Sequence, residues 1–251
     1  MKISIITVCY NSVSTIRDTF ESVLNQTYSD IEYVVVDGIS NDGTISIIKE
    51  YEQKFNGRMK WISEPDNGLY DAMNKGIKIT TGDIVGILNS DDIFFDYTVL
   101  EKIRIAFSNS EDICAVYADL YYVYTDNMNI IARKWITGKQ KLFKTGWHPA
   151  HPALYIKKEI YDKYGLFNLN YKLASDFEIM LRFIDKYKVN IVYLPEVIIK
   201  MRLGGKTNKN IKNIFLQNIE IIRAFKENNI DVDLYLYTIR RFVSKIKQYK
   251  K

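Results

Sequence analysis

Short apolar runs alternate, through the first half of the chain, with segments whose apolar residues recur at helical spacing. The runs are rich in β-branched residues and end in polar turn residues, which is typical of buried strands. Parallel strands need a crossover between them, so this order favours a mostly parallel sheet covered by helices. The predicted strands are residues 3–10, 31–36, 59–62 and 83–88, and the predicted helices are residues 14–25, 43–55 and 68–79.

The second half of the chain has a less regular order and ends in two helices. We predict strands over 115–124, 130–135, 153–156 and 190–194, and helices over 97–107, 158–164, 175–187, 215–228 and 234–250. With 251 residues, 47% of them hydrophobic, the chain is long enough for one large α/β domain, or for a smaller domain with an extension.

The positive charge of the chain is concentrated in its last segment. Residues 206–251 hold eleven Lys or Arg and four Asp or Glu, whereas the whole chain has a net charge of +5. A basic segment of this kind can meet nucleic acid, an anionic membrane surface or only solvent, and the sequence leaves these three open.

Cysteine content and hydropathy limit the expected cellular setting. Cys9 and Cys114 both stand among apolar residues, which argues against a disulfide framework or a cysteine-ligated zinc site. The first residues lack the apolar region of a signal peptide. No stretch reaches the roughly 18 to 20 apolar residues that a membrane-spanning helix needs. We therefore expect a cytoplasmic protein that does not span a bilayer.

Two adjacent carboxylates, Asp91 and Asp92, directly follow the apolar run 84–88. Ionised carboxylates are costly to desolvate beside a core, so the pair indicates a cation or a polar ligand. The alternative is a turn or a helix N-cap, in which Asp and Ser satisfy backbone N–H groups. The pair alone does not decide between the two.

The polar residues after the other predicted strands belong to the same edge, because ligands of open α/β sheets lie beyond the carboxyl ends of the strands. One of them, Asp37, stands where an acidic residue reads ribose in dinucleotide-binding folds. The glycine-rich phosphate loop of those folds is missing, since residues 9–12 contain no Gly, and this argues against NAD and against a P-loop. The candidates at this edge are Thr7, Asn11, Asp37, Gly38, Glu64, Asp66, Asp91 and Asp92.

A sugar nucleotide remains, with its diphosphate neutralised by a divalent cation, Mn²⁺ or Mg²⁺, instead of by a glycine loop. Asp91 and Asp92 supply the oxygen ligands that hard cations prefer. Adjacent residues on an extended strand point to opposite sides. We therefore expect one carboxylate to hold the metal and the other to address ribose or sugar hydroxyls, and we prefer Asp92 for the metal.

The order and spacing of several motifs resemble the family-2 glycosyltransferases of the GT-A fold, particularly bacterial enzymes that build capsule, O-antigen or colanic-acid-type polysaccharides. The resemblance is strongest in the N-terminal half and extends more loosely to about residue 207. The motifs are ISIITVCYN at 3–11, VVVD at 34–37 with DGT at 42–44, EPDNGLYDAMNKG at 64–76, GD at 82–83 and LNSDD at 88–92.

The resemblance implies a Rossmann-like α/β fold whose mixed, mostly parallel sheet is flanked by helices. It implies a GT-A catalytic domain over 1–207, with a nucleotide-sugar-binding half over 1–95 and an acceptor-binding half over 96–207. Residues 208–251 would form a basic amphipathic helical extension, able to lie on an anionic membrane or to pack on the domain or another subunit.

The resemblance also implies roles for particular residues. Asp37 would contact the nucleoside base, and Asp91 with Asp92 would form the acidic metal and ribose motif. Asp176, in ASDFEIMLR at 174–182, matches the family's proposed catalytic base, although it also suits the capping of a first helical turn. The expected donor-binding residues are Thr7, Asn11, Asp37, Asp66, Asp71, Asp91, Arg202 and Lys206; the expected acceptor-side residues are His151 and Trp147.

Some of these residues have a plainer interpretation. Arg202 and Lys206 would offset diphosphate charge from a mobile loop, or would be ordinary basic residues in solvent. Trp147 would stack on an acceptor sugar, or would belong to the core. The chain departs from the family pattern at three places. Asn89 stands where Asp is more usual, and Ser175 stands where Glu is more usual. Gly38-Ile39 replaces an acidic residue followed by Gly.

The expected function is transfer, with inversion, of a hexose or N-acetylhexosamine from a UDP-linked donor to a glycan acceptor. The acceptor would be attached to a lipid such as a polyprenyl diphosphate, which would bring the enzyme to the inner membrane surface; an oligomer is also possible. A nucleotidyltransferase is the nearest alternative, but it would bring a Gly- and Lys-rich loop after the first strand. A nucleic-acid-binding module would use the basic segment and bind in a salt-sensitive way.

Overall fold

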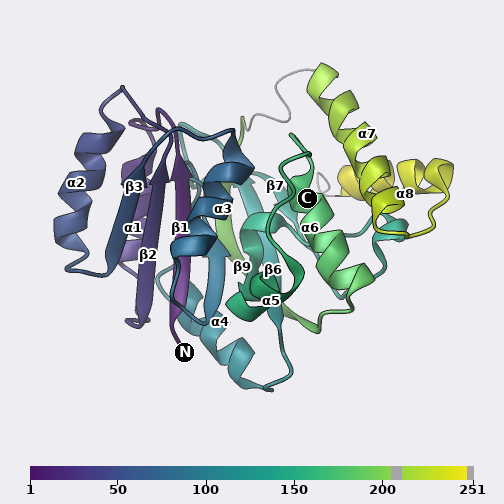
Figure 1. The fold of residues 1–251 in the computed structure, drawn as a ribbon, viewed down its shortest axis with the longest axis horizontal. Helices are drawn as coiled ribbons and strands as arrows, with labels where there is room; N and C mark the ends of the chain where they lie inside the picture. The colour runs from purple at the N-terminus through teal and green to yellow at the C-terminus, as the bar shows by residue number, and fades with distance from the viewer. Residues whose placement is uncertain (205–210, 248–251) are drawn as a thin grey trace.

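The computed structural model describes residues 1–204 and 211–247, and its centre is a sheet of nine strands (Figure 1). The strands follow the order β3-β2-β1-β4-β8-β6-β9-β5, and β7 pairs with β6 beside this path. Their bounds are β1 Ile3–Cys9, β2 Ile31–Asp37, β3 Met59–Ser63, β4 Ile84–Ile87, β5 Ile93–Phe94, β6 Ala115–Val123, β7 Ile131–Trp135, β8 Leu154–Lys157 and β9 Ile191–Arg202.

Helices cover both faces of this sheet. The predicted helix over 175–187 is present as α6 and its π-helical continuation η3. The helices are α1 Ile16–Leu24, α2 Thr44–Lys54, α3 Leu69–Ile79, α4 Val99–Ser108, α5 Lys158–Tyr164, α6 Ser175–Met180, α7 Ile211–Glu227 and α8 Leu234–Lys247, together with the short helices η1 Phe143–Thr145, η2 His151–Ala153 and η3 Leu181–Lys186.

The four strands predicted in the first half are confirmed, and they are parallel. β1 pairs with β2 and β4, and β2 pairs with β3. The register sets Cys9 opposite Asp37, and Asp37 opposite Ser63, so the polar residues after β1, β2 and β3 meet at one edge. The crossovers through α1, α2 and α3 are those that a parallel sheet requires.

The second half makes the sheet mixed, as predicted. β8 lies antiparallel between β4 and β6, whereas β6 and β9 are parallel. The two halves meet at β4 and β8, where Gly86 pairs with Tyr155. A Cβ on Gly86 would lie 2.3 Å from Cε1 of Tyr155, so the ring packs directly on the glycine backbone.

The last strand is longer than the sequence indicates. We predicted a strand over 190–194 followed by a loop, but β9 runs from Ile191 to Arg202. Its register against β6 shifts from Tyr117 opposite Tyr193 to Asp119 opposite Val197. Pro195 and Glu196 therefore lie in a bulge, where a proline is tolerated without ending the strand.

Each face of the sheet carries its own hydrophobic core, because side chains alternate along the strands. Along β1, Ile3 and Ile5 pack with α1, α2 and α4, while Ile6 and Val8 pack with α3, α5 and α6. β1, β2 and β4 are buried on both faces, as parallel strands usually are, whereas the edge strand β3 is only partly buried.

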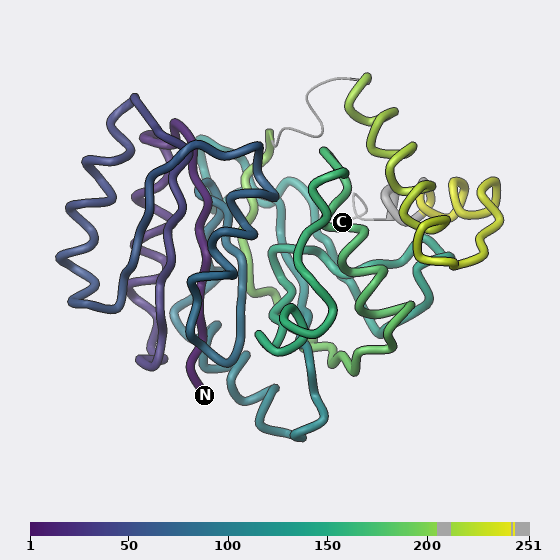
Figure 2. Tube along the Cα trace, in the orientation of Figure 1, coloured from purple at the N-terminus to yellow at the C-terminus, as the bar shows by residue number. Residues whose placement is uncertain are grey.

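The two C-terminal helices lie together at the end of the molecule farthest from α2 (Figure 2). Ile221 and Phe225 of α7 and Tyr237 of α8 belong to the same core as α6. The ring of Phe225 contacts Phe177 at 5.6 Å and Tyr237 at 5.1 Å between centroids. Across residues 1–204 and 211–247, none of the helices combines the length and apolar character needed to cross a membrane.

Candidate functional site

The loops after β1 and β2 are joined by the carboxylate of Asp37. This side chain is completely buried and accepts hydrogen bonds from the backbone N–H of Ser40 at 3.0 Å and from the hydroxyls of Ser40 and Ser63. Burial, followed by the charge of Asp37, raises the pKa of the Cys9 thiol, which contacts the same carboxylate. Asp37 therefore fixes the conformation of the loop 38–43 through hydrogen bonds, and its own side chain has no exposed surface.

Asn11 links the same two loops at the surface. Its backbone N–H donates to the Ser40 hydroxyl at 2.8 Å, and its side-chain oxygen accepts from the backbone N–H of Asn41 at 3.0 Å. Asn11 has a positive φ of 51°, which an asparagine tolerates better than most residues. Asn11 is exposed at this edge of the sheet, whereas the predicted contact between Asp37 and the nucleoside base is not made available by this geometry, because the Asp37 side chain is completely buried and both of its oxygens accept hydrogen bonds.

Asp66 lies against this loop pair from the other side. A Cβ on Gly38 would lie 2.5 Å from Oδ2 of Asp66, so a larger residue at this position would force the carboxylate to move. The other oxygen of Asp66 accepts from the backbone N–H of Gly68 at 2.8 Å. Asp71, half-buried on α3, accepts from the backbone N–H of Asn67 at 2.9 Å. Both carboxylates thus hold the turn that leads into α3.

Of the acidic pair, Asp92 is a buried structural residue. Its carboxylate accepts from the Asn89 side chain at 2.9 Å and from the backbone N–H of Arg202 at 3.2 Å. Burial, followed by the negative charge of Asp91, raises the pKa of Asp92 well above its usual value. Our preference for Asp92 as the metal ligand is wrong in this structure, because both of its oxygens are engaged inside the protein.

Asp91 is the better placed member of the pair. It is half-buried, and no hydrogen bond from its carboxylate to another residue is found within residues 1–204 and 211–247. Burial raises the pKa of Asp91, and the charge of Arg202 opposes this shift. A half-buried carboxylate of this kind is suited to a cation.

Arg202 closes the acidic loop from β9. Only 5% of its side chain is exposed, and its guanidinium donates to the backbone oxygen of Asp91 at 2.8 Å and to the carboxylate of Asp18. The prediction of a mobile loop residue is therefore wrong for Arg202, which is the last residue of a strand. Its Nε is buried without a hydrogen-bond partner. Lys206 lies outside the described residues.

Asp176 is presented at the start of α6, half-buried. Its Oδ1 accepts from the hydroxyl of Tyr70 at 3.0 Å, and the Tyr70 ring stacks on Phe167 with 5.6 Å between centroids. His151 contacts the other side of this cluster, 5.5 Å from the Phe167 ring. Burial lowers the pKa of His151, and the charge of Asp176 opposes the shift. The expected base and the expected acceptor-side histidine are therefore neighbours.

The backbone before Asp176 is held by a residue of α7. The carboxylate of Glu220 accepts from the backbone N–H groups of Lys172, Leu173 and Ala174 at 2.8 to 2.9 Å. Sequence analysis missed both Glu220 and Tyr70. Tyr70 stands inside the motif at 64–76, which offered a signal for it, whereas nothing local marks a contact between α7 and a loop so far away in the sequence.

Two predicted site residues are built into the interior instead. Thr7 is completely buried, and its hydroxyl donates to the backbone oxygen of Leu88 and accepts from Tyr33, both at 2.8 Å. Trp147 is a core residue whose ring nitrogen donates to the backbone oxygen of Thr137 at 2.9 Å. Neither side chain is free to contact a donor or an acceptor sugar, so both predictions are corrected.

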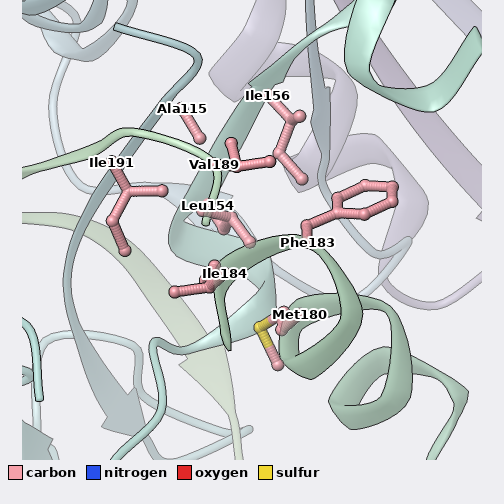
Figure 3. A pocket seen from close by; sticks show the side chains of 8 residues that line it. All are labelled: Ala115, Leu154, Ile156, Met180, Phe183, Ile184, Val189 and Ile191. Carbon is pink, nitrogen blue, oxygen red and sulfur yellow. The ribbon is translucent and has the colours of Figure 1, made fainter. Parts of the chain in front are cut away.

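A small apolar cavity beside α6 belongs to the core and not to this site. It has a volume of about 10 Å³ and is entirely apolar (Figure 3). Its lining comes from β6, β8, α6, η3, the start of β9 and the connection that precedes β9: Ala115, Leu154, Ile156, Met180, Phe183, Ile184, Val189 and Ile191. A space of this size has no room for a sugar nucleotide.

A metal at this site would depend on ligands that the protein does not supply. Among residues 1–204 and 211–247, no three His, Cys, Asp or Glu side chains gather as a metal-binding group. Magnesium and manganese are, however, often held by one or two carboxylates, with water and substrate phosphate oxygens completing the shell. The single available carboxylate of Asp91 fits a cation of that kind.

Comparison with known proteins places this arrangement among sugar-transferring enzymes. The family model "Glycosyl transferase family 2" matches residues 4–165. A PGL/p-HBAD biosynthesis glycosyltransferase of Mycobacterium bovis (strain BCG / Pasteur 1173P2) is 24% identical over 243 residues, covering 95% of this chain and 90% of the relative.

Solved structures share the fold at low sequence identity. S. aureus TarS 1–349 in complex with UDP-GlcNAc has a TM-score of 0.66 at 17% identity, covering 97% of this chain and 73% of TarS 1–349. The mannosyltransferase PcManGT from Pyrobaculum calidifontis, in complex with GDP-Man and Mn²⁺, has a TM-score of 0.66 at 16% identity, covering 98% and 73%. These likenesses confirm the predicted GT-A fold.

Proposed function

This chain belongs to glycosyl transferase family 2 and is a glycosyltransferase, and we propose that it moves a hexose or N-acetylhexosamine from a UDP-linked donor to a hydroxyl group of a lipid-linked glycan. The observation that carries the proposal is the position of Asp176, a half-buried carboxylate oriented by Tyr70 within a family 2 fold. The sugar nucleotides in the complexes of TarS and PcManGT support a nucleoside-diphosphate sugar as donor.

The donor would bind at the carboxyl edge of the parallel strands. The nucleoside would lie over the loops that Asp37 and Asn11 organise, beside Asp66, and the diphosphate would lie toward Asp91. When bound there, Mn²⁺ or Mg²⁺ would offset the negative charge that develops on the departing diphosphate. Arg202 adds a fixed positive charge behind Asp91 and orients the loop that carries it.

In the transfer step, the acceptor oxygen bonds to the anomeric carbon on the face opposite the diphosphate, and the bond from that carbon to the phosphate oxygen breaks. The configuration is therefore inverted. The proton of the acceptor hydroxyl passes to Asp176, which acts as the general base. Tyr70 occupies Oδ1 of this carboxylate and so leaves Oδ2 for the acceptor. The imidazole of His151, whose pKa is lowered by burial, lies near enough for the charge of the same carboxylate to oppose that shift.

A role in bacterial surface polysaccharide or glycolipid synthesis, such as capsule or O-antigen assembly, is the biological setting that we propose. The relative named as a PGL/p-HBAD biosynthesis glycosyltransferase supports a role in a biosynthetic route. An acceptor with a lipid part would be found at a membrane, which would make the enzyme peripheral to it.

The proposal is tested by a thermal-shift panel of UDP, GDP, CDP and dTDP sugars with and without Mn²⁺. We expect a UDP sugar with Mn²⁺ to raise the melting temperature. Asp176→Asn should keep this shift and lose transfer by a factor on the order of a hundred or more. The matched control is Asp162→Asn, an exposed aspartate of α5, which should change neither. No shift with any sugar nucleotide, or full transfer by Asp176→Asn, would contradict the proposal.

A further inference from the structure

The helices α7 and α8 turn apolar side chains away from the protein. Among the side chains that the structure describes in these two helices, five large apolar residues of each are exposed, with Phe215 at 65% and Tyr235 at 79% the most exposed of them. On α7 the exposed residues are Ile214, Phe215, Leu216, Ile219 and Ile222; on α8 they are Leu234, Tyr235, Leu236, Ile239 and Val243. Clusters of this kind are uncommon on a surface that meets only water.

This outer surface is separate from the packing of the two helices on the domain. The inner side of α7 uses Ile221 and Phe225 in the core, and α8 uses Tyr237. Residues spaced three and four apart share one side of a helix, so Phe215, Ile219 and Ile222 lie on one line along α7. Tyr235, Ile239 and Val243 do the same along α8. We call these six residues the docking face.

Cations accompany the docking face. Lys212 and Lys226 are exposed on α7, and Arg240 is exposed on α8, whose range Leu234–Lys247 contains no acidic residue. Arg223 and Arg241 have other partners, Glu227 for the first and the side-chain amides of Asn218 and Gln217 for the second, and Asp231 and Asp233 lie in the connection between the helices. The two acidic residues of α7 are engaged: Glu220 binds the backbone before Asp176, and Glu227 pairs with Arg223 and Tyr171. A second copy of this surface would bring like charges together, whereas an anionic surface complements them.

We propose that the docking face binds the surface of a bilayer containing anionic lipids. Exposed apolar side chains enter the boundary between headgroups and acyl chains, while Lys and Arg meet the lipid charges, as in other amphipathic helices that lie on membranes. Tyr235 has the apolar ring and polar hydroxyl that favour this boundary.

Hydrogen bonds connect α7, which carries part of the docking face, to the backbone just before α6, which carries Asp176. Glu220, on the inner side of α7, holds the backbone of residues 172–174, which immediately precede Asp176 in the sequence. If the proposed function holds, this connection would bring the base near the membrane from which a lipid-linked acceptor is presented. Membrane binding itself does not depend on that function.

Co-sedimentation of the full chain with lipid vesicles tests the proposal. We expect binding to vesicles of phosphatidylcholine mixed with phosphatidylglycerol, and much weaker binding to phosphatidylcholine alone. Raising the salt from about 0.1 M to about 1 M should weaken the binding, because the Debye length falls from about 10 Å to about 3 Å. Lys226→Gln with Arg240→Gln should weaken it at low salt by roughly fivefold for each cation removed.

Phe215→Ser with Tyr235→Ser should weaken vesicle binding on the order of tenfold or more, since two large apolar side chains are removed. The matched control is Tyr97→Ser with Ile130→Ser, which are exposed at 63% and 52% on other parts of the surface and should leave binding unchanged. Both double variants replace exposed residues and should keep the parent melting temperature.

Equal binding to neutral and anionic vesicles, or equal loss in the control variant, would overturn the proposal. So would a dimer, detected by analytical ultracentrifugation, that Phe215→Ser with Tyr235→Ser dissociates while vesicles stay unbound. Asp176→Asn separates the two proposals. Vesicle binding by this variant without transfer supports both, whereas transfer to a water-soluble acceptor without vesicle binding by the parent chain contradicts only membrane docking.

Discussion

The hydroxyl of Tyr70 donates a hydrogen bond to Oδ1 of Asp176, with 3.0 Å between the two oxygens. Tyr70 is the second residue of α3, which begins directly after the turn held by Asp66 and Asp71. Its ring stacks on Phe167, whose backbone makes two hydrogen bonds with the Asn74 side chain at 2.9 Å. One helix therefore connects the proposed donor site with the proposed base.

Tyr70→Phe should lower kcat on the order of tenfold and leave the affinity for the donor unchanged. The Asp176 carboxylate loses the donor that orients it, and hydrogen bonds to charged groups contribute about 1.5 to 3 kcal/mol. Steady-state kinetics measure kcat and KM separately, and calorimetry measures donor affinity. The control is Tyr161→Phe, another buried tyrosine, which should keep the parent kcat. An unchanged kcat in Tyr70→Phe would exclude a positioning role.

Asp91→Asn should remove the dependence of donor binding on Mn²⁺, whereas Asp92→Asn should retain it. The carboxylate of Asp91 is available to a cation, but both oxygens of Asp92 already accept hydrogen bonds. In Asp92→Asn, one of those donors would face an amide NH₂ group, at a cost of about 1 to 3 kcal/mol in the free energy of unfolding. Titration of UDP with and without Mn²⁺, and urea denaturation, measure the two effects. The opposite pattern would restore Asp92 as the ligand.

Gly38→Ala should weaken donor binding through Asp66. The new Cβ would lie 2.5 Å from Oδ2 of Asp66 and force that carboxylate to move. If this is the whole effect, adding Gly38→Ala to Asp66→Ala should cost little more binding, because the clash is then gone. Calorimetric titration of UDP into the parent, both single variants and the double variant closes this cycle. Additive losses would show that Gly38 acts by another route.

The stability of the protein should fall in acid through Glu32. Burial alone would raise its pKa, but hydrogen bonds from Lys60, Ser4 and Thr81 hold the pKa of Glu32 at about 2. A lowered pKa stabilises the fold above its unfolded value near 4.5, and this stabilisation is lost as the pH falls from 4.5 toward 2. The shift corresponds to roughly 3 kcal/mol.

Urea denaturation of the parent protein and of Glu32→Gln between pH 7 and pH 3 measures this effect. The free energy of unfolding of the parent should fall across that window, and most of this fall should be absent in Glu32→Gln. Glu50→Gln is the control. The pKa of Glu50 is also lowered to about 2, by Arg17 and Lys54, but this ion pair is exposed and screened by solvent. A similar loss in both variants would show that burial of Glu32 is not the cause.

The sequence predicted the architecture well where strands are buried on both faces. In β1, β2 and β4 an unbroken apolar run leaves little alternative to a parallel strand, and the polar residues that follow must then share an edge. The predicted end of the last strand was wrong at β9. Pro195 and Glu196 resemble the end of a strand, and the sequence alone does not show that the strand continues beyond them in its pairing with β6. Arg202 was consequently assigned to a loop, although it is buried and is the last residue of β9.

The choice between Asp91 and Asp92 was not decidable from the sequence. The alternation of a strand says that adjacent carboxylates point to opposite sides, but not which side is the interior. That answer depends on β9, which arrives 110 residues later along the chain and donates the Arg202 backbone N–H to Asp92. The core position of Trp147 and the contact made by Glu220 were not predicted for the same reason. Their partners are set by tertiary packing, which no local sequence pattern shows.

The pairing of Gly86 with Tyr155 limits how freely the two halves of such an enzyme can be exchanged by recombination. A chimera that takes residues 1–95 from one glycosyltransferase and the remainder from another joins them at β4 and β8, where an aromatic ring rests on a bare backbone. An N-terminal segment with any side chain at position 86 would require a smaller residue at 155. Chimeras of such enzymes therefore need to take the residues at positions 86 and 155 from the same parent.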